Sequence, residues 1–352
     1  MFSVAINLTS KIYIAGHSGM VGSAIIRKLK EDGFNNLILR SHKELDLINQ
    51  NDVFQFFESE KPDLVIIAAA KVGGIHANNT YRGQFLYENL MIQSNLIHAS
   101  HEVGVKKLLF LGSACIYPRN APQPIKEEHL LTDKLEFTNE PYAIAKIAGI
   151  KLCENYYRQY SDNFISVMPN NLYGSNDNFD LKNSHVLPAL MKKFHEAKMQ
   201  NAELVEIWGT GKPLREFLHV DDLADACVYL MKNLDAETLY NLPCLPALRE
   251  HAGNRGEFKR GQEKEKSVGN ISHINIGSGE EVSIKELSKM IKNVVGYKGD
   301  LYFNADYPDG TPRKLLDVSR MNAMGWKSKI TLDVGLASVY KWYIQYETQQ
   351  IY

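Results

Sequence analysis

The chain has 352 residues, of which 44% are hydrophobic, and its 40 basic and 41 acidic side chains nearly balance. This balance does not favour nucleic acid or an anionic membrane as a partner, and no apolar run reaches the roughly 20 residues that span a bilayer. Residues 1–10 lack the basic start and the apolar segment of a signal peptide. We therefore expect a cytoplasmic protein with one large domain and a smaller one.

The first half of the chain alternates short apolar stretches with helical patterns, which predicts an α/β fold with a doubly wound parallel sheet. We expect strands at 11–15, 36–40, 63–69, 106–111 and 163–169, and helices near 19–31, 49–59, 83–103 and 141–160. The run 64–70 is apolar throughout, which is typical of a strand that is buried on both faces.

The first predicted strand leads directly into a glycine-rich turn at the start of a helix, with the spacing G-x-x-G-x-x-G. Glycine allows a tight turn and lets the backbone approach a pyrophosphate, which the N–H groups of the helix N-terminus then bind. The order strand, turn, helix favours a Rossmann-type dinucleotide site over a turn without a ligand. The residues expected to contact the dinucleotide in this turn are Gly16, Ser18, Gly19, Met20, Val21 and Gly22.

The end of the second predicted strand indicates which dinucleotide is bound. An NAD site usually places a carboxylate about 20 residues after the glycines, where it binds the ribose 2′-hydroxyl. Arg40 and Ser41 stand there instead, and Asp46 follows in the loop expected to pass the adenine. A cation and a hydroxyl suit a 2′-phosphate, so we expect NADP(H). The alternative for Arg40 is an ordinary solvated charge at the end of a strand.

Two later runs bring a hydroxyl, a thiol, a phenol and an amine into one predicted site. Tyr142 and Lys146 are four residues apart and therefore lie on one face of a predicted helix. An ammonium beside a phenol, whose free pKa is about 10, favours the phenolate. Such a phenol exchanges a proton with a carbonyl or alkoxide while a nicotinamide exchanges hydride. Ser113 is expected to hydrogen-bond the same substrate oxygen, and Cys115 is a thiol that a simple reductase does not need.

After Gly174 the alternation stops, which predicts a smaller C-terminal substrate-binding lobe, while 273–277 has the pattern of a strand that returns to the sheet. The expected NADP-binding domain is 11–175, with 216–240 and 271–278 returning to it. The expected lobe comprises 176–215 and 279–345. Residues 248–270 are charged and poor in apolar side chains, so we expect a flexible surface loop, with a regulatory or partner-binding role as an alternative.

The four cysteines, Cys115, Cys153, Cys227 and Cys244, lie far apart in the sequence. Their spacing matches neither a zinc site nor a disulfide framework, so we expect no metal. Cys153 and Cys227 fall within helical patterns and are expected in the core.

Several long motifs carry a resemblance that covers residues 11–345. They are the segments 19–23, 68–74, 77–81, 115–118, 139–149, 183–186, 215–222 and 308–317. On these motifs the chain resembles the GDP-L-fucose synthases, which are the GDP-4-keto-6-deoxymannose epimerase/reductases of the extended short-chain dehydrogenase/reductase family. The resemblance implies NADPH as the cofactor and a GDP-linked 4-keto sugar as the substrate. It also implies a homodimer that pairs through the helices near 83–103 and 141–160.

The resemblance further implies two reactions at one site. A 4-keto group acidifies the hydrogens on C3 and C5, and epimerisation needs a base and an acid on opposite faces of the sugar. By resemblance the base is Cys115 and the acid is His185, while Ser113 and Tyr142 stabilise the enolate oxygen. NADPH then delivers hydride to C4, with Tyr142 protonating the alkoxide and Lys146 holding the ribose. The alternatives are a small core residue for Cys115 and a locally bonded helix-start side chain for His185.

Further binding residues are also carried over by resemblance. Besides the glycine turn and Lys146, the expected cofactor contacts are Gly112, Pro169, Asn170, Asn171, Leu172 and His185. The expected contacts of the nucleotide sugar are Lys193, Trp208, Arg215 and Asp309. The guanidinium of Arg215 matches a diphosphate in shape and charge. Trp208 is expected to stack on the base, with a buried structural tryptophan as the alternative.

Some positions depart from the family pattern. Ser18 stands where some bacterial relatives have an arginine, and Lys193 replaces an arginine. Asn170 replaces a threonine, and Ser175-Asn176 replace Pro-His near the expected sugar pocket. These changes leave open an alternative substrate, a GDP-4-keto-heptose that is reduced at C4 without epimerisation.

Three other activities are weaker alternatives. A 4,6-dehydratase needs acidic residues where Ala114 and Cys115 stand, and a UDP-hexose 4-epimerase that keeps NAD bound is disfavoured by Arg40 and Cys115. A non-enzymatic NADP sensor can dispense with the catalytic tyrosine, which this chain retains as Tyr142.

Overall fold

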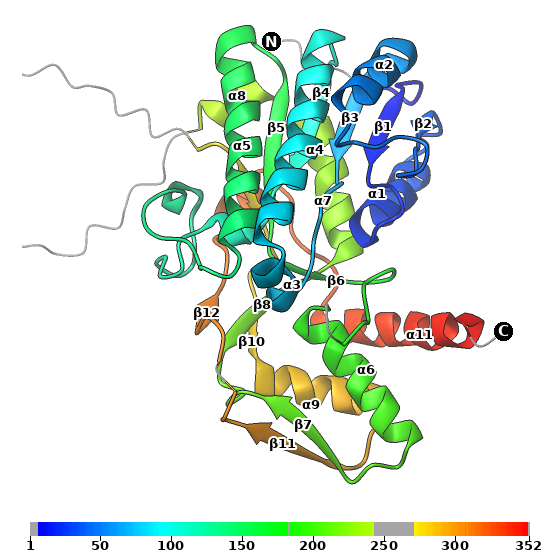
Figure 1. Ribbon diagram of the computed structural model, residues 1–352, viewed down its shortest axis with the longest axis vertical. Coiled ribbons are helices and arrows are strands. Elements are labelled where there is room, and N and C mark those ends of the chain that lie inside the picture. The colour runs from blue at the N-terminus through cyan, green and yellow to red at the C-terminus, as the bar shows by residue number, and fades with distance from the viewer. Residues whose placement is uncertain (1–5, 182–183, 243–270, 308, 351–352) are drawn as a thin grey trace, which may run out of the picture.

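The computed structural model describes residues 6–181, 184–242, 271–307 and 309–350 (Figure 1). Its larger body is built on a six-stranded parallel sheet in the order β2-β1-β3-β4-β5-β9. The strands are β1 (Ile12–Ala15), β2 (Leu37–Ile38), β3 (Leu64–Ile67), β4 (Lys107–Leu111), β5 (Phe164–Pro169) and β9 (Ile274–Ile276). The predicted doubly wound α/β fold is confirmed. The order reverses between β1 and β3, and ligands bind at the carboxyl ends of the strands beside such a switch point.

Helices cover both faces of this sheet, and the strand pleat sends alternate side chains to each face. On one face lie α1 (Met20–Glu31), α7 (Val220–Asn233), α8 (Ala236–Tyr240) and α10 (Ser319–Ala323), which pack on Ile12 and Ile14. On the other lie α2 (Gln50–Glu60), α4 (Arg82–Glu102) and α5 (Glu140–Tyr160), which pack on Tyr13 and Ala15. The ends of α1, α2, α4 and α5 fall within one residue of the predicted ends.

The chain builds a smaller body beyond the carboxyl ends of these strands, below the large sheet in the view of Figure 1. A four-stranded sheet contains β6 (Asn171–Tyr173), β8 (Leu214–His219), β10 (Glu281–Ser283) and β12 (Arg313–Lys314). A two-stranded sheet pairs β7 (Leu204–Trp208) with β11 (Asp300–Asn304). The helices α6 (Val186–Met199), α9 (Ile284–Val295) and α11 (Leu332–Gln350) enclose a separate apolar core that includes Phe194, Leu287 and Leu336.

The two bodies are interleaved along the chain. Because β8 pairs with β6, β10 and β12, residues 214–219 lie in the smaller sheet, and the chain rejoins the larger body at α7. The expected boundary at residue 216 therefore falls inside a strand of the smaller body. The charged segment 248–270 and Cys244 lie outside the described residues. No helix in the described ranges is long and apolar enough to cross a membrane.

Three short helical elements complete the description. They are the helix α3 (Ile75–Thr80), the 3-10 turn η1 (Ala114–Ile116) directly after β4, and the 3-10 turn η2 (Glu127–His129).

Candidate active site

The turn between β1 and α1 requires glycine at two positions. Gly16 has a φ of +82°, and a Cβ there would lie 2.6 Å from the backbone N of Ala69. A Cβ on Gly22 would lie 2.1 Å from the carbonyl oxygen of Gly16, so the helix packs directly on the turn. Gly19 is the N-cap of α1, where no side chain caps the helix and no acidic residue occupies the first turn. The N–H groups at this helix end therefore suit a phosphate.

The other residues of the turn surround this helix end. Ser18 is exposed, whereas Met20 and Val21 are half-buried and pack against the core under α1. The side chain of Asn176 reaches this region from the segment after β6, because its amide donates to Ser23 Oγ at 3.0 Å. This departure from the family pattern thus lies beside the dinucleotide turn.

Arg40 has a partner that the sequence did not predict. Its guanidinium donates to Glu60 Oε1 at 2.6 Å and to the carbonyl oxygen of Leu39 at 3.0 Å. A 2′-phosphate at this position would share the guanidinium with Glu60, and the role of Arg40 toward the 2′-phosphate stays a prediction. Asp46 accepts a hydrogen bond from the backbone N of Ile48 at 3.0 Å, which is a local turn contact.

The end of β4 and the start of α5 bring the predicted catalytic side chains together. Ser113 precedes η1, which carries Cys115, while Tyr142 and Lys146 lie one helical turn apart on α5. Lys146 Nζ donates to the carbonyl oxygen of Leu111, the last residue of β4, at 2.8 Å. It also lies 5.8 Å from the ring centroid of Tyr142. The ammonium therefore connects the helix to the end of the strand.

Burial controls the ionisation of this group. It raises the pKa of the Cys115 thiol, against the opposing effects of the Lys314 charge, a hydrogen bond with Ser113 and the Lys146 charge. It also raises the pKa of Tyr142 and lowers that of Lys146 to about 8. Burial and the neighbouring Cys115 both raise the pKa of Tyr142, so in this structure they favour the phenol, and the expected effect of Lys146 on the phenolate stays a prediction.

His185 is the N-cap of α6, but its side chain accepts no capping hydrogen bond from the described residues of the helix. The side chain is exposed, yet desolvation and the charge of Lys314 lower its pKa. Both observations fit a side chain that solvent reaches and that still has protein atoms close around it. The motif 183–186 is only partly visible, because Asn183 lies outside the described residues.

Lys314 is a site residue that the sequence prediction missed, although it belongs to the quoted motif 308–317. It lies in β12 and pairs in register with Arg215 of β8. Its charge acts on both Cys115 and His185, and it forms no ion pair with a carboxylate in the described ranges. The only signal in the sequence was the position of Lys314 between Arg313 and Leu315-Leu316, in a segment whose apolar residues show no helical periodicity.

In the smaller body, Trp208 is 60% exposed, which rules out the buried structural alternative. Its ring stacks on that of Tyr307, with centroids 4.5 Å apart and planes at 12°. Lys193 Nζ lies 5.1 Å from the Trp208 ring centroid and 3.4 Å from the carbonyl oxygen of Glu206. An accessible indole suits the aromatic base of a nucleotide, and the nearby ammonium suits a phosphate group of the same nucleotide.

Arg215 and Asp309 differ in how many of their hydrogen-bonding groups already have a partner. Arg215 is half-buried and donates to the carbonyl oxygen of Leu214 at 2.8 Å, and it has no ion-pair partner within the described residues. Its guanidinium therefore retains donors for an anion. Asp309 already accepts from the backbone N of Thr210 at 2.9 Å and from its hydroxyl at 2.6 Å.

The segment after β5 joins the two bodies. The buried Asn170 donates its side-chain amide to the Glu216 carboxylate, and Asn171 donates to the carbonyl oxygen of Glu216 at 2.8 Å. The side chain of Asn170 thus points into a polar junction with Glu216 and Lys314, and its expected roles at the cofactor and the sugar pocket stay predictions. Pro169 ends β5, and Leu172 is half-buried in β6.

Gly112 is also explained by packing. A Cβ on Gly112 would lie 2.0 Å from Cε of Met168, so a larger residue where β4 leaves the sheet beside β5 would make this methionine side chain move. Cys153 and Cys227 are fully buried, which confirms their expected place in the core. In the part of the chain that the structure describes, no cluster of three or more His, Cys, Asp or Glu side chains is arranged to bind a metal ion.

The comparisons with known proteins agree with this geometry. Residues 12–242 match the NAD dependent epimerase/dehydratase family. The chain is 56% identical over 337 residues to GDP-L-fucose synthase 1 of Arabidopsis thaliana, covering 96% of this chain and 94% of the relative. It is 52% identical over 335 residues to the GDP-L-fucose synthase of Escherichia coli (strain K12), covering 95% and 97%. Among solved structures, MlghC, the GDP-mannoheptose C4 reductase from Campylobacter jejuni with NADP bound, superposes with a TM-score of 0.82 at 43% identity, covering 97% and 100%.

Proposed function

The chain belongs to the NAD dependent epimerase/dehydratase family, among its GDP-L-fucose synthases, and we propose that it epimerises and reduces a GDP-4-keto-6-deoxy sugar with NADPH. The observation that carries the proposal is the group of side chains at the end of β4. There a thiol, Cys115, joins the Ser113, Tyr142 and Lys146 set that a reductase alone requires. A second proton-transfer group is what epimerisation adds to reduction.

The cofactor is NADP(H). When bound, it would supply the hydride for C4, which no amino-acid side chain can supply. The tight turn at Gly16 and Gly22 and the uncapped N-terminus of α1 fit its pyrophosphate. Lys146 would hold the ribose, since its ammonium keeps two donors beyond the bond to Leu111. NADP in the solved relative supports the choice of dinucleotide.

Different side chains of the protein carry out the separate proton transfers. The raised pKa of Tyr142 keeps the phenol protonated at neutral pH, so it donates a hydrogen bond to the substrate oxygen and later gives its proton to the alkoxide. Cys115 must lose its proton before it acts as a base, and the nearby charges of Lys314 and Lys146 stabilise the thiolate. His185, whose pKa is lowered, gives up its proton readily once protonated.

Binding of the nucleotide sugar is assigned to the smaller body, and the dinucleotide to the larger one. Arg215 offers the remaining donors of its guanidinium for the diphosphate, and Trp208 offers an exposed indole for the base. Asp309 and Lys193 lie around the same indole and the Thr210 turn.

The decisive experiment measures NADPH oxidation, with NADH in parallel, on GDP-4-keto-6-deoxymannose in deuterated water, followed by NMR of the product. We expect deuterium at C3 and C5, inversion at both centres and reduction at C4, with NADPH preferred. Cys115→Ser should lose deuterium incorporation by about 10²–10⁴-fold, as expected for a lost general base. Tyr142→Phe separates an enzyme, which loses reduction, from a sensor, which keeps only NADP(H) binding.

A second candidate substrate is a GDP-4-keto-heptose, because the superposed Campylobacter jejuni protein is named a GDP-mannoheptose C4 reductase. The higher identity to the two fucose synthases favours the deoxyhexose. The same assay decides between them, because reduction of the heptose at C4 without deuterium would identify the reductase alone.

The assembly that fits this function is a cytoplasmic homodimer. Along α4 and α5, which pack side by side, Tyr87, Ile144 and Tyr160 are 59%, 43% and 49% exposed. Large apolar side chains on adjacent helices support pairing with a second copy. Light scattering should give twice the chain mass, and Ile144→Glu should reduce it toward the monomer; a monomeric wild type would contradict the assignment.

A further inference from the structure

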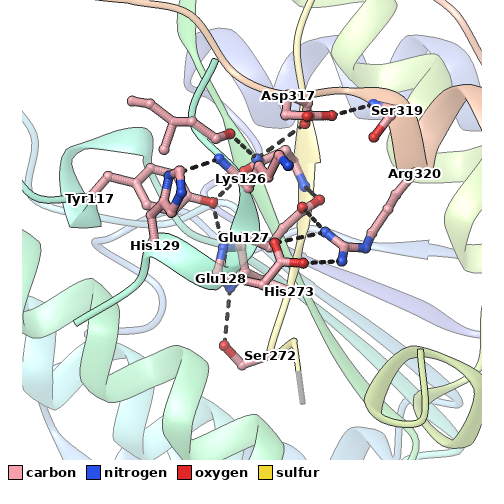
Figure 2. A network of polar contacts seen from close by, with 12 residues as sticks. Tyr117, Lys126, Glu127, Glu128, His129, Ser272, His273, Asp317, Ser319 and Arg320 are labelled. Atoms are coloured by element: carbon pink, nitrogen blue, oxygen red, sulfur yellow. Dashed lines mark hydrogen bonds and ion pairs between the residues drawn. The ribbon is translucent and has the colours of Figure 1, made fainter. Parts of the chain in front are cut away.

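A buried polar network includes Tyr117, which follows Cys115 by two residues in the chain (Figure 2). It joins four segments that are distant in sequence: Tyr117 after η1, residues 125–129, residues 272–275 at β9, and residues 317–320 before and in α10. Tyr117, His273 and Asn275 are at most 3% exposed. Buried polar groups that are all paired fix one arrangement of the chain, since any other arrangement leaves some of them without a partner.

The first branch of the network has a defined donor direction at every step. The Ser272 hydroxyl contacts His273 Nδ1 at 3.1 Å, and His273 Nε2 contacts the Tyr117 hydroxyl at 2.6 Å. The Tyr117 hydroxyl itself donates to Asn275 Oδ1. Because that proton is committed to Asn275, Nε2 of His273 must be the donor to Tyr117, and Nδ1 must accept from Ser272.

The second branch carries this arrangement to the segment that leads from β12 into α10. Asn275 Nδ2 donates to the carbonyl oxygens of Ile125 and Asp317, at 2.9 and 3.2 Å. The backbone N of Asn275 donates to Glu127 Oε1 at 3.1 Å, and Arg320 donates to both Glu127 and Glu128. The two carboxylates thus face one guanidinium, as Figure 2 shows.

Each end of the network is two or three residues from a group in the candidate site. Tyr117 follows Cys115 by two residues, and Ile116 between them is fully buried. Asp317 follows Lys314 by three residues, and the intervening Leu316 donates its backbone N to Glu216 at 3.0 Å, next to Arg215. The same hydrogen bonds therefore fix the thiol and its neighbouring cation with respect to each other.

We propose that Tyr117, held by His273 and Asn275, is a positioning residue that fixes η1 so that Cys115 faces Ser113 and Lys314. The residue touches neither substrate nor cofactor and acts through the turn. The proposal rests on the proposed function in one respect only, which is that Cys115 transfers a proton.

The test compares Tyr117→Phe with Tyr240→Phe in the full-length protein. Both changes remove one hydroxyl from a tyrosine that is 3% or 2% exposed, and the Tyr240 hydroxyl donates to the carbonyl oxygen of Phe164, remote from η1. The Cys115 peptide is quantified by mass spectrometry after timed alkylation with iodoacetamide from pH 7 to about pH 11, because burial raises the thiol pKa above its ordinary value. The midpoint of the rate profile reports the thiol pKa, which a general loss of stability does not move.

In Tyr117→Phe we expect this midpoint to rise by about half a unit, which is about a threefold loss of thiolate at lower pH. Exchange of the substrate C3 and C5 protons with deuterated water, measured with NADP⁺ so that no hydride is delivered, should fall at least in proportion. Tyr240→Phe should match the wild type in both measurements. If Tyr117→Phe does not fold, Asn275→Ser removes the acceptor of the same hydroxyl and should shift the midpoint in the same direction.

A wild-type midpoint in Tyr117→Phe, or an equal shift in Tyr240→Phe, would overturn the positioning role. If the wild-type protein exchanges no substrate protons, it is the proposed function that fails, while the alkylation midpoints still decide the role of Tyr117.

Discussion

Acid should destabilise this protein through one histidine of the buried network. His273 is 0% exposed, and burial lowers its pKa from 6.5 to about 3. The unfolded chain therefore binds a proton below pH 6.5 that the folded protein does not bind until about pH 3, so stability is lost as pH falls through this window. At pH 5 the unfolded histidine is favoured by about 2 kcal/mol, whereas at pH 7.5 the effect is close to zero.

Urea unfolding followed by circular dichroism at pH 7.5 and pH 5.0 measures this difference. His273→Gln is the matched variant, because its amide keeps an N–H donor for Tyr117 and does not titrate. The other histidines whose pKa is lowered, including His185 and His219, remain in both proteins and cancel. The stability lost between the two pH values should be about 2 kcal/mol smaller in the variant. Equal losses in both proteins would refute the reasoning.

Three further outcomes follow from the geometry. Gly22→Ala should lower kcat/KM by about 10²-fold, because its Cβ meets the Gly16 carbonyl oxygen at 2.1 Å and displaces the phosphate turn by about 1 Å. Gly19→Ala, whose Cβ lies 3.6 Å from the same oxygen, should change kcat/KM only slightly. Equal losses of kcat/KM in the two variants would contradict this. Trp208→Ala should raise KM for the GDP-sugar by about threefold to tenfold and leave kcat and the melting temperature unchanged, because the exposed indole would serve only to stack on the base. A lowered melting temperature would indicate a structural role instead. Arg320→Met should cost about 3–5 kcal/mol of unfolding free energy, because it leaves Glu127 buried without its cation. Arg27→Met breaks an ion pair with Asp221 that is about half exposed, so it should cost under about 1 kcal/mol. Similar losses of unfolding free energy in the two variants would contradict the stabilising role of the buried pair.

The larger body was predictable because its signals are local. Apolar periodicity places α1, α2, α4 and α5 within one residue of their ends, and the glycine turn marks where β1 passes into α1. The smaller body gives no such signal. Its strand β12 has two residues and exists only because it pairs with β8, about 100 positions earlier in the chain.

The candidate site divides in the same way. Ser113, Cys115, Tyr142 and Lys146 lie in two short motifs, and the structure brings them together at the end of β4. What the motifs do not report is the surroundings of each side chain. The partner of Arg40 is Glu60, twenty residues away, and the ionisation of Tyr142 depends on burial by elements outside its helix. Lys314 was missed because its closeness to Cys115 comes from a sheet register, not from a spacing.

The position of α7 and β9 has a consequence for synthesis of the chain. The face of the large sheet that carries Ile12, Ile14 and Leu109 is covered by α7, residues Val220–Asn233, and the sheet edge beside β5 is closed by β9 at Ile274–Ile276. A nascent chain that ends near residue 175 therefore has most of the strands but exposes one apolar face and one unpaired edge. The larger body is completed only late in translation, and a chain released early would present an aggregation-prone sheet to its neighbours.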